Sequence, residues 1–200
     1  MNDEYNTIEK EATGYFKDKG SKFFSFAYPV KTEEEVKELL QKLKKEHHSA
    51  RHHCYAWRIG TEEIITRAND DGEPSSTAGK PILGQLSSYN ITNILVVVVR
   101  YFGGTLLGVS GLINAYKNAA INVLENTEII AKRIEYTIEL QFEYPLLNTV
   151  MQTIKQEGFD ITNTDFKESC KLLFTVRKTD AEKAKQIFEH IYGVNVKKLL

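Results

Sequence analysis

The sequence of 200 residues predicts an α+β protein with two domains, residues 1–130 and 131–200. Six β-branched or aliphatic residues at positions 94–99 predict a central strand that is buried on both faces. From residue 136 onward the hydrophobic pattern predicts the element order β-α-β-β-α-β. Hydrophobic residues make up 42% of the chain and charged residues 26%, which are typical values for a globular protein.

The first domain is predicted to begin with a β-hairpin. Residues 7–13 and 21–30 alternate in polarity or are rich in aromatic residues, and a polar turn separates them. Thr32 followed by Glu35 is a capping-box pattern. The apolar stripe that follows it predicts a helix that reaches about His47.

Two further strands are predicted at residues 52–59 and 64–68, and residues 69–74 have the composition of a turn. The hydroxyl side chains at residues 75–77 can cap a short helix whose first turn holds Pro81. Apolar residues at helical spacing give this helix a buried side.

The strand at residues 94–99 leads through Gly103 and Gly104 into a long helical pattern that ends near Asn126. Residues 127–133 are short and mixed in character, so the domain boundary is predicted there. The second domain should then contain strands near 136–142, 159–166, 170–177 and 194–199, a helix that ends at Gly158, and a helix capped by Thr179 with Glu182. This order is typical of the ferredoxin-like arrangement.

The junction between the central strand and the long helix is predicted to bind an anion. A helix start offers unpaired N–H groups and the positive end of its dipole, and glycines allow an anion to approach closely. No Asp or Glu occurs between Pro74 and Leu124. The predicted anion-binding residues are Gly79, Lys80, Arg100, Gly103, Gly104 and Thr105. Close packing of the helix on a sheet is an alternative explanation for Gly108 and Gly111.

An acidic turn precedes this region. Asp70, Asp71 and Glu73 form an acidic group that could hold Mg²⁺, and a structured turn is the alternative. The His52/His53/Cys54 cluster that precedes the turn also suggests a metal site. In a strand, however, His52 and Cys54 share a face while His53 points the other way. The sequence therefore predicts no metal site and no cofactor, assigns no catalytic residue, and leaves the role of this cluster open.

The overall charge and the start of the chain limit the classes of function. The net charge is -1, so any contact with nucleic acid must come from a local patch. The start of the sequence has no signal-peptide pattern, and no run of about 18 apolar residues occurs. We therefore expect a cytoplasmic protein that makes no membrane contact and keeps its two cysteines reduced.

Four blocks of the sequence resemble the IMPACT family, in its bacterial YigZ-like branch. The blocks are residues 50–54 (ARHHC), 70–74 (DDGEP), 77–81 (TAGKP) and the run from RYFGG at 100–104 to Gly111-Leu112. The resemblance extends over residues 1 to 200 or nearly so. It implies a first domain similar to the second domain of a small-subunit ribosomal protein and to domain four of elongation factor G. The second domain would resemble domain five of the same factor.

The resemblance and the residues together predict a non-catalytic binding protein linked to translation regulation. It would bind RNA, the ribosome or a ribosome-associated partner through a glycine-rich anion-binding surface where residues 70–81 meet residues 100–111. The alternative is an enzyme that acts on a phosphorylated small molecule or nucleotide, with Asp70, Asp71 or Glu73 as metal ligand or base. A regulator that contacts only other proteins is a third possibility.

Overall fold

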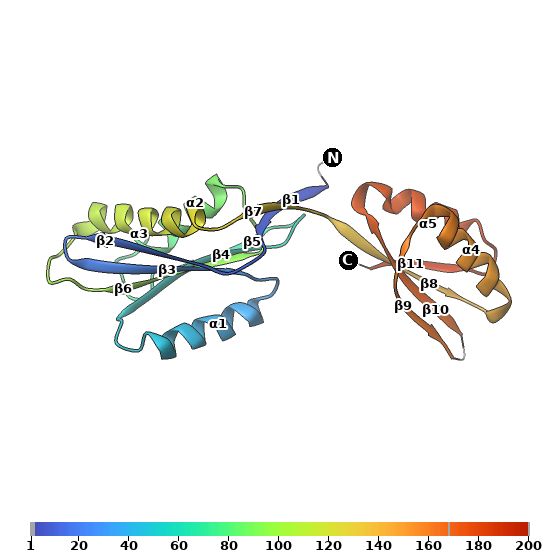
Figure 1. Ribbon diagram of the computed structural model, residues 1–200, viewed down its shortest axis with the longest axis horizontal. Helices are drawn as coiled ribbons and strands as arrows, with labels where there is room; N and C mark the ends of the chain where they lie inside the picture. Colours follow the sequence, from blue (N-terminus) through green and yellow to red (C-terminus); the bar gives the residue numbers. More distant parts are fainter. Residues whose placement is uncertain (1–2, 168, 200) are drawn as a thin grey trace. The chain divides into compact units, whose positions relative to one another are not determined.

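The computed structural model describes residues 3–167 and 169–199. It combines helices and strands, in agreement with the predicted α+β class. The chain forms two compact units (Figure 1). Two buried hydrophobic clusters lie in the first unit and another lies in the second, and none of them combines residues of both. One unit is Tyr5–Lys132, and the other comprises the described residues from Arg133 onward together with those before Tyr5. None of the helices in the described residues is long and apolar enough to span a membrane.

The first unit is built on a five-stranded antiparallel sheet. Its spatial order is β2 (Ala12–Asp18), β3 (Ser21–Pro29), β6 (Ile94–Tyr101), β4 (His52–Ile59) and β5 (Ile65–Asn69). Helix α1 (Glu33–Glu46) covers one face, and helices α2 (Gly79–Ser88) and α3 (Gly108–Glu125) cover the other (Figure 1). A separate two-stranded sheet pairs β1 (Glu4–Ile8) with β7 (Ile129–Arg133).

Strand β6 is the central strand of this sheet, as the sequence predicts. Alternate residues of β6 belong to two different cores: Ile94, Val96 and Val98 pack towards α2 and α3, and Leu95, Val97 and Val99 pack towards α1. All six side chains are buried. The continuous apolar run therefore reflects helices on both faces of the sheet, although the strand pairing is antiparallel.

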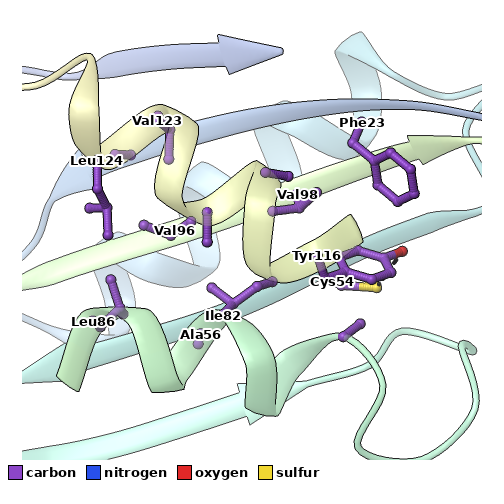
Figure 2. Packing of buried hydrophobic residues seen from close by; sticks show 14 of the residues in the cluster. Phe23, Cys54, Ala56, Ile82, Leu86, Val96, Val98, Tyr116, Val123 and Leu124 are labelled. Atoms are coloured by element: carbon purple, nitrogen blue, oxygen red, sulfur yellow. Dashed lines mark hydrogen bonds between the residues drawn. The ribbon is translucent and has the colours of Figure 1, made fainter. Parts of the chain in front are cut away.

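The core between α2, α3 and the sheet is shown in Figure 2. It joins residues of α2 and α3 to residues of the strands, among them Ile82, Leu86, Tyr116, Val123, Leu124, Val96, Val98, Phe23, Cys54 and Ala56. Full burial of a large apolar side chain contributes about 1.5–3 kcal/mol. This core holds the first turns of α2 and α3 in place beside the end of β6.

The predicted first strand of the hairpin, residues 7–13, is wrong in its bounds. The polar residues 9–11 are exposed and interrupt it, so β1 ends at Ile8 and pairs with β7, and β2 begins after them. The hairpin is formed by β2 and β3 instead. Its turn residues Lys19 and Gly20 have φ values of 42° and 85°, the left-handed conformation that tight hairpin turns require.

The predicted capping box of α1 is confirmed in its main contact. Thr32 Oγ1 accepts a hydrogen bond from the Glu35 backbone N–H at 3.2 Å. The Glu35 carboxylate in turn accepts one from the Lys31 backbone N–H at 2.6 Å. The helix therefore begins at Glu33, as this pattern predicts.

The second unit has the element order β-α-β-β-α-β. Its elements are β8 (Glu135–Phe142), α4 (Leu147–Glu157), β9 (Asp160–Phe166), β10 (Cys170–Arg177), α5 (Ala181–Glu189) and β11 (Asn195–Leu199). The four strands form one antiparallel sheet in the order β11-β8-β10-β9. Gly158 ends α4 in the left-handed conformation, as predicted. The predicted cap at Thr179 is wrong, because Thr179 lies inside a 3-10 turn, Lys178–Asp180, that precedes α5.

Candidate functional site

The loop between β5 and α2 is organised by the carboxylate of Asp70. Asp70 Oδ1 accepts hydrogen bonds from the backbone N–H groups of Ala78 and Gly79 at 3.0 and 2.8 Å, and Oδ2 accepts one from Ser76 at 2.8 Å. Burial alone would raise the pKa of Asp70, but these hydrogen bonds and the charge of Lys80 hold that pKa below its usual value. The N-terminus of α2 therefore already holds an anion, the carboxylate of Asp70.

The hydroxyl cap predicted for α2 is therefore wrong. Thr77 Oγ1 donates instead to the Pro74 carbonyl at 2.7 Å. Gly79 is needed because a Cβ there would press against the backbone of Asn69. That close approach brings the start of α2 within reach of the Asp70 carboxylate.

Asp71 ties the same loop to β4 and α1. Its carboxylate accepts a hydrogen bond from the His53 backbone N–H at 2.7 Å and lies 3.2 Å from Lys44 Nζ. Its carbonyl oxygen is 2.9 Å from His52 Nδ1. Burial lowers the pKa of His53, although the nearby Asp71 carboxylate opposes this effect. His52 and His53 thus support the turn.

Glu73 and Arg100 form a buried ion pair. Arg100 Nη1 donates to Glu73 Oε1 at 2.6 Å, and the two side chains are only 7% and 4% exposed. Tyr116 OH donates to the same carboxylate oxygen at 2.8 Å. The guanidinium also lies 5.7 Å from the ring centroids of Phe23 and Phe102. The charge of Arg100, which the sequence assigned to an external anion, is therefore balanced inside the protein.

Cys54 completes this buried network beside Tyr116 (Figure 2). Its thiol donates to the Asp70 carbonyl at 3.0 Å and lies 3.3 Å from Tyr116 OH. Burial raises the pKa of the Cys54 thiol well above its usual value, so the reactive thiolate is suppressed. Among residues 3–167 and 169–199, no group of three or more His, Cys, Asp or Glu side chains could hold a metal ion.

A cavity of about 470 Å³ opens at the N-terminus of α3. Its lining joins the end of the acidic turn to the segment after β6 and comprises Arg51, His52, Glu73, Pro74, Arg100, Phe102, Leu106, Leu107, Gly108, Val109 and Leu112. We call it the α3 cavity. Its apolar rim is open to solvent, with Phe102 54%, Leu106 83% and Val109 60% exposed. The side chain of the N-cap residue, Leu107, makes no capping hydrogen bond to the first N–H groups of α3.

The other predicted anion-binding residues lie outside the lining of the α3 cavity. Lys80 is exposed in the first turn of α2. Gly104 and Thr105 lie in the exposed segment between Phe102 and Leu106. Gly103 packs so closely against the β2–β3 turn that a Cβ at this position would overlap the backbone of Gly20. Helix α3 begins at Gly108 rather than at the two glycines.

Sequence reasoning did not single out Arg51 as a binding residue. Arg51 is exposed and lines the α3 cavity. It directly precedes β4, whose first residue His52 pairs with Arg100 of β6. Arg51 lies beside the end of β6 because of the register of this antiparallel pairing, which the sequence alone does not specify.

Comparison with known proteins places the chain in a family. The sequence model of the protein family described as "Impact N-terminal domain" matches residues 19–124 of this chain. The chain is 35% identical over 149 residues to the IMPACT family member YvyE of Bacillus subtilis, covering 74% of this chain and 69% of that protein. It is 38% identical over 152 residues to the IMPACT family member YigZ of Escherichia coli, covering 74% of each.

A solved structure described as that of a hypothetical protein also aligns with the chain. The alignment covers 100% of this chain and 98% of the other, with 28% identity and a TM-score of 0.74. The matched domain model, the curated relatives and the sequence blocks lead to one conclusion. The chain belongs to the IMPACT family, in its YigZ-like branch.

Proposed function

We propose that this chain is a non-catalytic binding protein linked to translation regulation, and that it binds RNA through the surface around the α3 cavity. Membership of the IMPACT family supports the link to translation, because the family resemblance implies modules like those of a translation factor. The ribosome or a translation-associated protein would then supply or accompany the RNA. We further assign a ribosomal-protein domain-2-like fold to the first unit and a ferredoxin-like fold to the second. The strand order β11-β8-β10-β9 supports the second assignment.

The observation that carries the proposal is the open N-terminus of α3 in a cavity that combines a cation with an exposed aromatic ring. The N–H groups of the first turn, which Leu107 does not cap, favour a phosphate oxygen, and Arg51 supplies an exposed positive charge in the lining of the same cavity. Phe102 offers a face on which a nucleotide base can stack. The only carboxylate among the lining residues is that of Glu73, and Arg100 neutralises it.

The enzyme alternative has less support. Asp70, Asp71 and Glu73 each accept short hydrogen bonds from groups of the chain itself. A metal ligand or general base needs a free carboxylate oxygen aimed at the substrate. Their arrangement matches the structured turn that the sequence left as the alternative.

Removal of two cations is expected to weaken RNA binding without unfolding the protein. We expect the double variant Arg51→Ala/Lys80→Ala to bind a labelled stem-loop RNA with a single-stranded tail more weakly than the parent. The slope of log affinity against log salt should fall by roughly 0.7–0.9 for each phosphate that the variant no longer neutralises. Fluorescence anisotropy over a salt series measures both quantities. Arg100 is unsuitable for this test because its side chain is half of a buried ion pair.

A matched control is Lys183→Ala in the second unit, where the side chain is 75% exposed. It removes a positive charge from a residue that lines neither the α3 cavity nor any other part of the first unit. Parent-like binding and salt dependence in the double variant would contradict the proposal. So would the absence of RNA binding by the parent at low salt.

A further inference from the structure

The face of the sheet that packs against α1 continues beyond that helix as a row of aromatic side chains. Helix α1 ends at Glu46, and the ring of His47 lies 6.0 and 5.3 Å from the rings of Phe24 and Phe26. His47 Nδ1 is also 2.9 Å from the hydroxyl oxygen of Tyr101. These rings are half-buried, so each presents part of its surface to solvent.

The strand register brings aromatic and basic residues together on this face. Tyr15 of β2 lies opposite Phe24 of β3, with ring centroids 5.1 Å apart. Two residues further along β2, Lys17 pairs with Lys22 of β3, and Lys22 also pairs with Tyr101 of β6. Alternate residues of a strand share a face, so the two rows lie side by side. We call the surface formed by these five residues and by Phe26 and His47 the aromatic sheet face.

Two neighbouring cavities hollow the aromatic sheet face. One of about 350 Å³ is lined by Gly20, Lys22, Phe24, His47, Tyr101 and Phe102. The other, of about 510 Å³, is lined by Thr13, Gly14, Tyr15, Phe24, Phe26, His47 and Asn126. Phe24 and His47 line both, and neither lining contains a carboxylate.

The charge on this surface identifies the kind of ligand. Lys17 and Lys22 are exposed, and within the described part of the chain neither forms an ion pair. Partly exposed rings beside unpaired cations, with no carboxylate among them, suit stacked bases joined by phosphates. An apolar protein segment would gain nothing from the two lysines.

We propose that the aromatic sheet face stacks the unpaired bases of RNA, so that the ligand of this protein is a single-stranded segment. The inference rests on the proposed function and specifies its ligand. Phe102 lines both the smaller of these cavities and the α3 cavity, so one strand can pass from one to the other. Bases would stack on Tyr15 and Phe24, and phosphates would lie near Lys17 and Lys22.

The test compares a single-stranded 12-nucleotide RNA with the fully paired duplex of the same sequence, using fluorescence anisotropy and the full chain. The parent should bind the single strand at least 10-fold more tightly than the duplex. Tyr15→Leu keeps apolar volume but removes the ring, and should weaken single-strand binding about 10-fold. Tyr15→Phe should restore it. Tyr15 is 47% exposed, so neither change should affect folding.

Tyr192→Leu in the second unit is the control, because its side chain is 98% exposed and lies outside both cavities. Parent-like single-strand binding by Tyr15→Leu, or equal affinity of the parent for both RNAs, would overturn this inference. If either result is found and Arg51→Ala/Lys80→Ala still weakens RNA binding, the inference about the aromatic sheet face fails but the proposed function stands. If the parent binds neither RNA, both proposals fail.

Discussion

Replacing Glu73 with alanine is expected to lower the free energy of unfolding by about 3–5 kcal/mol, the usual cost of breaking a buried ion pair. The substitution leaves the positive charge of Arg100 buried without a counter-charge, and it removes the acceptor of the Tyr116 hydroxyl. Ser21 Oγ, 3.4 Å from Arg100 Nη2, is too weak a partner to replace a carboxylate. Urea denaturation followed by circular dichroism measures the change.

Two comparisons separate the buried charge from a general effect of substitution. Glu34→Ala breaks an ion pair with Lys37 whose side chains are 76% and 65% exposed, and should cost less than about 1 kcal/mol. The double variant Glu73→Leu/Arg100→Met should be more stable than Glu73→Ala, because it removes both charges and keeps volume. Equal destabilisation by Glu73→Ala and Glu34→Ala would show that the pair carries no buried charge.

Gly103→Ala is expected to destabilise the first unit by roughly 3 kcal/mol or more, because overpacking against a rigid backbone cannot relax by side-chain rotation. The new Cβ would overlap the Gly20 carbonyl carbon and the Ser21 backbone nitrogen. It would also disturb the hydrogen bond from the Gly103 N–H to Ser21 Oγ at 3.2 Å. Thermal unfolding by calorimetry measures the effect.

Gly84→Ala is the matched control for this prediction. Gly84 lies inside α2, and apart from its chain neighbours and the nearby backbone of its own helix no atom lies within 4 Å of the position that its Cβ would take. The change should therefore stabilise the protein by up to about 1 kcal/mol through helix propensity. A thermal midpoint for Gly103→Ala that equals or exceeds that of Gly84→Ala would refute the close contact with the β2–β3 turn.

Local patterns in the sequence predict much of the fold, because the elements concerned are specified by neighbouring residues. The apolar run at 94–99 predicts a strand buried on both faces, and β6 occupies that place. The pattern at residues 52–59 matches the bounds of β4. Thr32 and Glu35 predict the start of α1 because a capping contact spans only three residues.

The roles of the candidate site residues depend on contacts between distant parts of the chain. Arg100 and Glu73 are 27 residues apart, so the sequence could not show that their charges cancel. Asp70 caps α2 only because the loop folds back to place it beside Gly79. From the sequence, Gly103 is predicted to bind an anion, yet the lack of a side chain at this position is required by contact with Gly20.

The sequence pattern also does not predict the aromatic sheet face. The aromatic residues of β2 and β3 are typical of strands, and together with the polar turn between them they predict a hairpin. Which of them remain partly exposed depends on where α1 ends over the sheet and how His47 packs at its end. That placement follows from the packing of α1 against the sheet and not from the helix pattern itself.

RNA that binds as proposed follows the surface from the α3 cavity to the aromatic sheet face. Ultraviolet cross-linking of a single-stranded RNA containing 4-thiouridine to the full chain, with peptide mapping by mass spectrometry, would locate that path. We expect cross-links in the peptides that contain Tyr15, Tyr101 and Phe102, and a reduced yield with Arg51→Ala. Cross-links confined to residues after Arg133, or none at low salt, would contradict both the path and the proposed function.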